Sequence, residues 1–91
     1  MEEKRTEIRQ RASRLAVLIN SENIAYSTTV VDCSEHGLGL EVPIVPSLEV
    51  GDNVRVRMRH REIEGTVVRF QEAEKTWQVG LRLDEALGER L

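Results

Sequence analysis

The chain has 91 residues, with 13 Lys and Arg against 16 Asp and Glu and a formal net charge of −3, so its length suits one domain around one core. Its single cysteine excludes a disulfide scaffold and a cysteine-rich zinc module. No apolar run approaches the roughly 18 to 20 residues of a membrane span, and the N-terminus lacks the apolar core of a signal peptide. We therefore expect a cytoplasmic protein without membrane insertion.

Two compositional features narrow the fold and the ligand class. Hydrophobic residues make up 40% of the chain but aromatic residues only 3%, so the core must be aliphatic, which suits a small β-barrel or sandwich. Among the cations, Lys4 and Lys75 are the only lysines and all others are arginines. Arginine binds planar anions with two parallel hydrogen bonds, whereas lysine does not.

The first 20 residues are compatible with a helix or a strand. Apolar residues recur at helical spacing at Ile8, Ala12, Leu15 and Ile19. The continuous apolar run 15–19, followed by a polar turn, also suits a buried strand. Because a strand here would close a small barrel, we predict a loop or frayed helix up to Ser13 and a strand from Arg14.

From Tyr26 onward the sequence alternates with period two and is interrupted by turn residues, which is the pattern of an all-β protein. A β-branched run at 28–33 ends in a polar turn, and a short strand follows around Leu38 and Leu40. Pro43 and Pro46 then interrupt any strand ladder.

The second half of the chain predicts three more strands. In the clearest of them, Val54, Val56 and Met58 alternate with arginines at 55, 57 and 59, so one face should be buried and the other cationic. The next strand covers 63–70, with Gly65 as its expected bulge or bend. The last covers 76–83 and leads into a short helix or tail over 84–91, with Asp84 as N-cap.

The residue types that catalysis or metal binding requires are sparse. His36 and His60 lie 24 positions apart and match no metal-ligand spacing. Alternation places the Cys33 thiol in the core, and Glu62 and Glu64 suit pairing with neighbouring arginines. We therefore predict no enzyme, no catalytic residue and no metal site.

Two groups of residues favour a ligand. Arg5 and Arg9 stand four residues apart in a polar leader, where two guanidinium groups could close on a planar anion, and Arg11 and Arg14 could add phosphate contacts. Arginine is frequent enough here that such a pair is also expected by chance.

The second group occupies the polar turn 32–37. The Asp32 carboxylate can accept hydrogen bonds from a guanine edge, Ser34 can reach a phosphate or ribose, and Gly37 permits a tight turn. The same residues also suit an ordinary β-turn, in which Asp32 and Ser34 are caps and Gly37 has a positive φ.

Together, the Arg5–Arg9 pair and the Asp32, Ser34 and Gly37 triplet resemble the motifs of PilZ domains, bacterial receptors for cyclic di-GMP. Further segments resemble the family at 37–40, 46–51, 65–69 and 77–83, so nearly the whole chain is covered. The resemblance implies a six-stranded antiparallel barrel with a C-terminal helix and a ligand bound where the leader folds over the barrel. It also implies that Arg5 and Arg9 clasp the bases and phosphates, Asp32 and Ser34 read a guanine edge, and Gly37 shapes the turn.

These observations define one hypothesis for the whole chain. Residues 1–91 form a single PilZ domain, with a ligand-binding leader at 1–13, a barrel at 14–83 and a short helix or tail at 84–91. The leader closes over cyclic di-GMP, with no other cofactor, and changes the surface shown to a separate effector protein of the motility, pilus or exopolysaccharide (biofilm) machinery.

The alternative is a PilZ-like adaptor that binds a protein but no nucleotide, through the arginines at 55, 57, 59 and 61. Nucleic-acid binding is disfavoured, because the net charge is negative and stacking rings are few.

Overall fold

The computed structural model describes residues 8–88, which form six β-strands and no helix. The strands are β1 (Gln10–Ile19), β2 (Ala25–Ser34), β3 (Gly37–Val42), β4 (Asn53–Met58), β5 (Arg61–Glu72) and β6 (Trp77–Leu83). The predicted all-β fold with six strands is confirmed. The described residues contain no helix with the length and hydropathy needed to cross a membrane.

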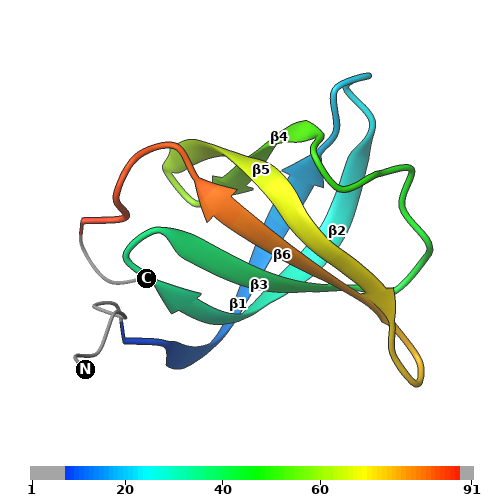
Figure 1. Ribbon diagram of the computed structural model, residues 1–91, viewed down its shortest axis with the longest axis horizontal. Helices are drawn as coiled ribbons and strands as arrows, with labels where there is room; N and C mark the ends of the chain where they lie inside the picture. Colours follow the sequence, from blue (N-terminus) through cyan, green and yellow to red (C-terminus); the bar gives the residue numbers. More distant parts are fainter. Residues whose placement is uncertain (1–7, 89–91) are drawn as a thin grey trace, which may run out of the picture.

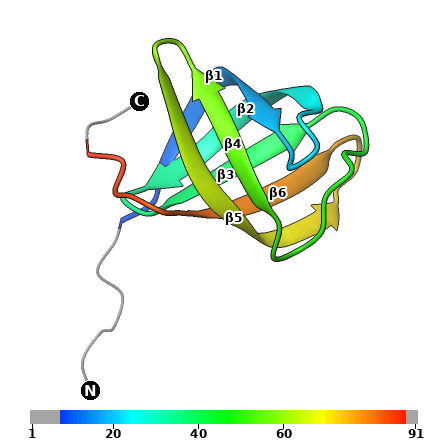
Figure 2. The same cartoon turned by 90° about the horizontal axis from the view of Figure 1, so that it is seen from above.

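The six strands form a closed barrel in the order β1-β2-β3-β6-β5-β4, and every neighbouring pair is antiparallel. Pairing between β1 and β4 closes the ring, as the two views in Figures 1 and 2 show. Closure satisfies the backbone donors and acceptors that would otherwise line two open sheet edges.

The barrel is filled by aliphatic side chains, as the composition predicts. The largest side chains with less than 2% exposure are Leu18, Leu38, Leu40, Val30, Val42, Val56, Val67 and Val79. Phe70 and Trp77 are only partly buried and pack against this core, with their ring centroids 5.4 Å apart. The aromatic rings therefore border the core and do not form its centre.

The strand β4 has the alternation that the sequence predicts. Val54, Val56 and Met58 are buried, whereas Arg55 and Arg57 lie on the outer face. Arg59 is not part of the strand: it lies in the turn to β5 and has a φ of 46°.

The strand β1 begins at Gln10, four residues before the predicted start at Arg14. Gln10 and Arg11 lie opposite Cys33 and Asp32 of β2, and a register shift follows between Arg11 and Arg14. Only Ala12 in this polar stretch packs against the core, so no apolar alternation marked it as a strand. The helical spacing is not used, because Ile8 and Leu15 are 78% and 84% exposed.

Two further expectations differ from the structure. Gly65 pairs regularly with both neighbouring strands, and the bulge of β5 lies instead between Val67 and Arg69. Residues 84–88 form a bend and an irregular segment without a helix, so over these residues the predicted short helix or tail is a tail, and 89–91 lie outside the described residues. In this segment, Leu87 N donates to Glu35 O of the β2–β3 turn at 2.7 Å, and Asp84 N donates to Glu64 O of β5 at 3.0 Å.

Candidate functional site

The polar residues of the turn motif lie on the outer face of β2, at its C-terminal end. Cys33 is buried in the core with 9% exposure, so its neighbours Asp32 and Ser34 point outward. Opposite them in β3 stand two glycines: Asp32 pairs with Gly39, and Ser34 pairs with Gly37. This part of the barrel surface therefore carries a carboxylate and a hydroxyl beside two positions of β3 that have no side chain.

Arg9 joins the leader to this surface. Its Nη2 forms an ion pair with Asp32 Oδ1, and its Nη1 donates a hydrogen bond to Ser34 Oγ at 3.3 Å. The side chains of Arg9 and Asp32 remain 47% and 36% exposed, whereas Ser34 is buried beneath them. The structure thus brings together one guanidinium, one carboxylate and one hydroxyl from segments more than 20 residues apart in the sequence.

The two glycines provide the space for this arrangement. A Cβ on Gly37 would lie 2.8 Å from Arg9 Nη1 and 3.1 Å from Ser34 Oγ, and one on Gly39 would lie 2.6 Å from Asp32 Oδ1. Gly37 has no positive φ, so a turn that requires a left-handed backbone does not explain it. The close approach of the Arg9 and Ser34 side chains explains why this position has no side chain.

Gly39 was not among the predicted site residues. The sequence signal that could have identified it is a second glycine two positions after Gly37, on the same face of the strand.

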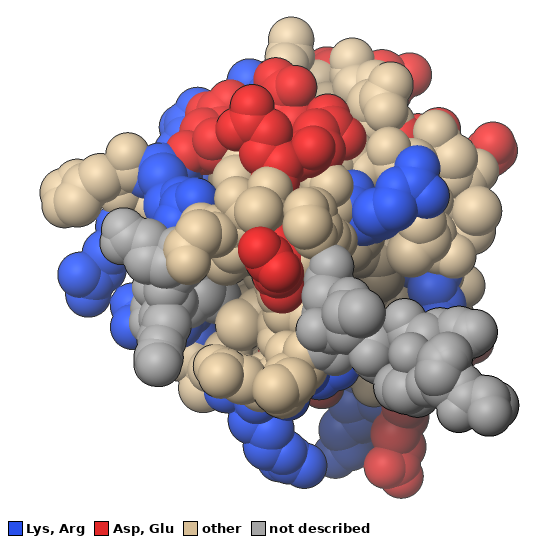
Figure 3. Space-filling model, turned by 60° about the vertical axis from the view of Figure 1, so that its left-hand side comes forward, with Lys and Arg blue, Asp and Glu red and all other residues tan. Residues whose placement is uncertain are grey.

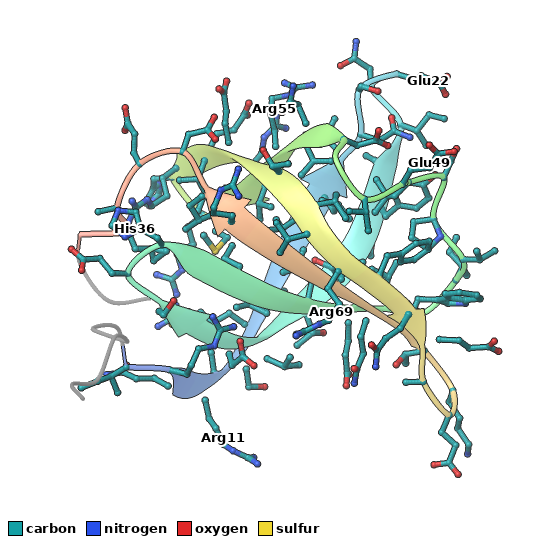
Figure 4. The ribbon with its side chains drawn as sticks, in the orientation of Figure 1. Arg11, Glu22, His36, Glu49, Arg55 and Arg69 are labelled. Carbon is teal, nitrogen blue, oxygen red and sulfur yellow. The ribbon has the colours of Figure 1, made fainter. Side chains whose placement is uncertain are left out.

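The remaining arginines of the leader differ in position. Arg5 lies outside the described residues. Arg11 is exposed and stands opposite Asp32, and Figure 4 shows its side chain directed away from the barrel. Arg14 stands opposite Val30, which is fully buried, so it projects from the other face of the strand and does not join the cluster.

A hollow of about 240 Å³ lies beside the cluster at the end of the barrel. It is lined by Ile8, Gln10, Cys33, Ser34, Glu35, Leu87 and Gly88. The leader, the motif turn and the C-terminal segment therefore border one shared space.

The charges on the barrel are unevenly distributed. Acidic side chains gather on one part of the face in Figure 3, with Lys and Arg side chains around them. Four carboxylates line a second hollow, between β5 and the segment after β6: Glu62, Glu64, Asp84 and Glu85. An anionic ligand would be repelled from this region and attracted to the arginines.

The arginine face of β4 is engaged by a carboxylate, as the sequence predicts for Glu62. Arg57 Nη2 lies 3.2 Å from Glu62 Oε1, and Arg55 Nη1 lies 3.1 Å from Glu62 Oε2. Hydrogen bonds from Arg57 and then Arg55 lower the pKa of the Glu62 carboxyl. Arg61 donates to the Leu87 carbonyl oxygen at 2.9 Å. Three of the four arginines of the alternative docking surface thus have internal partners.

Comparison with known proteins identifies a matching sequence family and solved structures with a similar fold. The sequence model of the PilZ domain family matches residues 3–91, whereas no curated protein sequence matches the chain significantly. The structure of Bacillus subtilis inhibitor of motility (MotI/DgrA) is similar, with a TM-score of 0.77 and 18% identity over 96% of this chain. The chain spans about half of that protein, 46% of its length.

A second similar structure is the PilZ domain of YcgR from Escherichia coli with c-di-GMP, with a TM-score of 0.74 and 16% identity. The match covers 90% of this chain and 79% of the YcgR chain. At such low identities, both likenesses concern the fold alone.

Proposed function

The chain belongs to the PilZ domain family, and from this premise we propose that it is a receptor for cyclic di-GMP that acts by binding and without catalysis. The observation that carries the proposal is the contact of Arg9 with both Asp32 and Ser34, beside the two glycines of β3. The YcgR domain with c-di-GMP has the same fold, which supports the same ligand class here.

Each residue of the cluster has a chemical role in this proposal. The Asp32 carboxylate accepts hydrogen bonds from the N1–H and amino group of a guanine, and Ser34 bonds a phosphate or ribose oxygen. The forked donors of Arg9 bind phosphate oxygens or the O6 and N7 atoms of guanine, with Arg5 as a second fork. Gly37 leaves the space that the Arg9 guanidinium and the Ser34 hydroxyl occupy.

Binding requires the cluster to exchange partners. Arg9 forms an ion pair with the Asp32 carboxylate, and in this proposal the ligand contacts both groups. Charge-assisted hydrogen bonds to the ligand, worth about 1.5 to 3 kcal/mol each, can replace the exposed ion pair and offset the ordering of a short segment. Because β1 already begins at Gln10, the closing movement that we propose concerns the leader before that residue.

Closure of the leader would change the surface shown to a separate effector protein. MotI is an inhibitor of motility by its name, which favours the motility machinery over pili or exopolysaccharide synthesis. The surface that closure would change includes the hollow lined by Ile8 of the leader and by Leu87 and Gly88 of the C-terminal segment.

Calorimetric titration with cyclic di-GMP tests the proposal. We expect saturable binding, with one ligand molecule or an intercalated pair per chain. Arg5→Ala, Arg9→Ala and Asp32→Ala should each raise the Kd by about tenfold to a hundredfold, the equivalent of about one lost charged hydrogen bond. Unchanged affinity in all three variants would refute the site, and absence of heat with the wild type would favour the adaptor that binds no nucleotide.

A further inference from the structure

One row of residues crosses the outer face of the barrel from β2 to β5. In register, Asp32 of β2 stands opposite Gly39 of β3, Gly39 opposite Gly80 of β6, and Gly80 opposite Arg69 of β5. The row thus has a carboxylate at one end, an arginine at the other and two glycines between them. At a strand spacing of about 4.8 Å, the backbone of Arg69 lies at most about 14 Å from that of Asp32.

The bulge in β5 puts Arg69 on this face. Two residues of β5, Val68 and Arg69, span the step that Gly80 alone spans in β6. Val67 is buried before the bulge, Phe70 packs against the core after it, and both residues between them are exposed. Without the extra residue, Arg69 and Val67 would point the same way, into the barrel.

The side chain of Arg69 lies over the glycine that it faces. A Cβ on Gly80 would be 3.3 Å from the Cβ of Arg69 and 3.5 Å from its Nε and Nη2. Figure 4 shows Arg69 beside β6 and β3, on a different side of the barrel from Arg55. Among residues 8–88, its guanidinium has no hydrogen-bond or ion-pair partner, so its donors are available to a ligand.

We propose that Arg69 is a further ligand-binding residue and that Gly39 and Gly80 form the floor between it and Asp32. This inference rests on the proposed function, since it extends the same site across the barrel. A guanine held by Asp32 leaves the other half of a cyclic dinucleotide over the glycines. There, Gly39 and Gly80 add no side chains of their own to the surface, and the Arg69 fork can donate to phosphate oxygens or to the second guanine.

Calorimetry with cyclic di-GMP on Arg69 variants tests this extension. Arg69→Ala and Arg69→Gln should each raise the Kd at least tenfold, and the second variant keeps the aliphatic stem over Gly80. Arg55→Ala is the matched control, because it removes the same charge from another side of the barrel and should change the Kd less than twofold. Thermal unfolding of each variant verifies that the barrel is intact.

The outcomes separate this inference from the function on which it rests. If wild type binds, Asp32→Ala weakens binding and both Arg69 variants stay within twofold of wild type, the extension across β6 is wrong and the receptor function stands. If the wild type does not bind, both are wrong. If Arg55→Ala weakens binding as much as Arg69→Ala, the loss of affinity comes from the change in net charge, and a specific contact of Arg69 with the ligand is refuted.

Discussion

The Asp32 carboxylate occupies the place on β3 that a side chain at position 39 would need, since a Cβ on Gly39 would lie 2.6 Å from Asp32 Oδ1. The two residues are direct partners in the β2–β3 ladder. The position of the carboxylate, and with it the ion pair to Arg9, thus depends on the absence of a side chain in the neighbouring strand.

Gly39→Ala should therefore impair ligand binding far more than folding. The new methyl group must displace the exposed Asp32 carboxylate, which can move into solvent, so we expect a change in unfolding free energy of no more than about 1 kcal/mol. The Kd for cyclic di-GMP should rise at least tenfold. In an Asp32→Ala background, the same substitution should raise the Kd by a smaller factor than in the wild type, and fully additive losses by calorimetry would contradict this explanation.

Leu38, between the two site glycines, is a fully buried core residue. Leu38→Ala leaves a cavity in the barrel and should lower the free energy of unfolding by about 2 to 5 kcal/mol. Leu15 is the matched control, because it is 84% exposed on β1 and Leu15→Ala should cost less than about 0.5 kcal/mol. Urea denaturation of both variants measures the difference. Similar losses of unfolding free energy would mean that Leu38 is not a core residue of the barrel.

Asn20 holds the β1–β2 connection together. Its Oδ1 accepts hydrogen bonds from the backbone N–H groups of Glu22 and Ile24, both at 2.9 Å, and its Nδ2 donates to Ser47 O at 3.1 Å. Because Asn20 is only 3% exposed, Asn20→Ala should lower the unfolding free energy by about 1 to 3 kcal/mol. Asn53→Ala serves as the exposed control for the same urea experiment, and an equal effect of both would exclude this role.

Glu62 should titrate below the ordinary pKa range of a glutamate, because Arg57 and Arg55 both donate hydrogen bonds to its charged form. Its contribution to stability is present above the pKa of the unfolded chain and is lost as the pH falls through the lower, folded value. NMR titration of the side-chain carboxyl measures this pKa directly. It should rise in Arg57→Ala, and an unchanged value in that variant would show that the ion pair is absent in solution.

The strands with one buried face could be predicted from sequence because burial imposes a period of two. In β4, Val54 and Val56 mark that period. The first part of β1 contains only Ala12 as an inward residue and then shifts register, so its polar sequence could not be distinguished from a loop. The bulge in β5 lies at Val68 and not at Gly65. Its position depends on how β5 pairs with β4 and β6, which the sequence of β5 alone does not show.

The sequence predicts which residue types form the candidate site, but not how their side chains are placed relative to one another. Asp32, Ser34 and Gly37 stand close in sequence, but Arg9 reaches them only through the register of β1 on β2. Gly39 could not be recognised from composition, since its importance follows from the strand partner that faces it. Long-range register therefore decides which arginines meet the carboxylate.

The most direct test of the receptor function is an NMR titration of the ¹⁵N-labelled protein with cyclic di-GMP. We predict saturable shifts of the backbone amides of Arg9, Asp32, Ser34, Gly37 and Gly39, while the β4 amides of Arg55 and Arg57 remain unchanged. No saturable shift at millimolar ligand, or shifts confined to β4, would contradict the proposal.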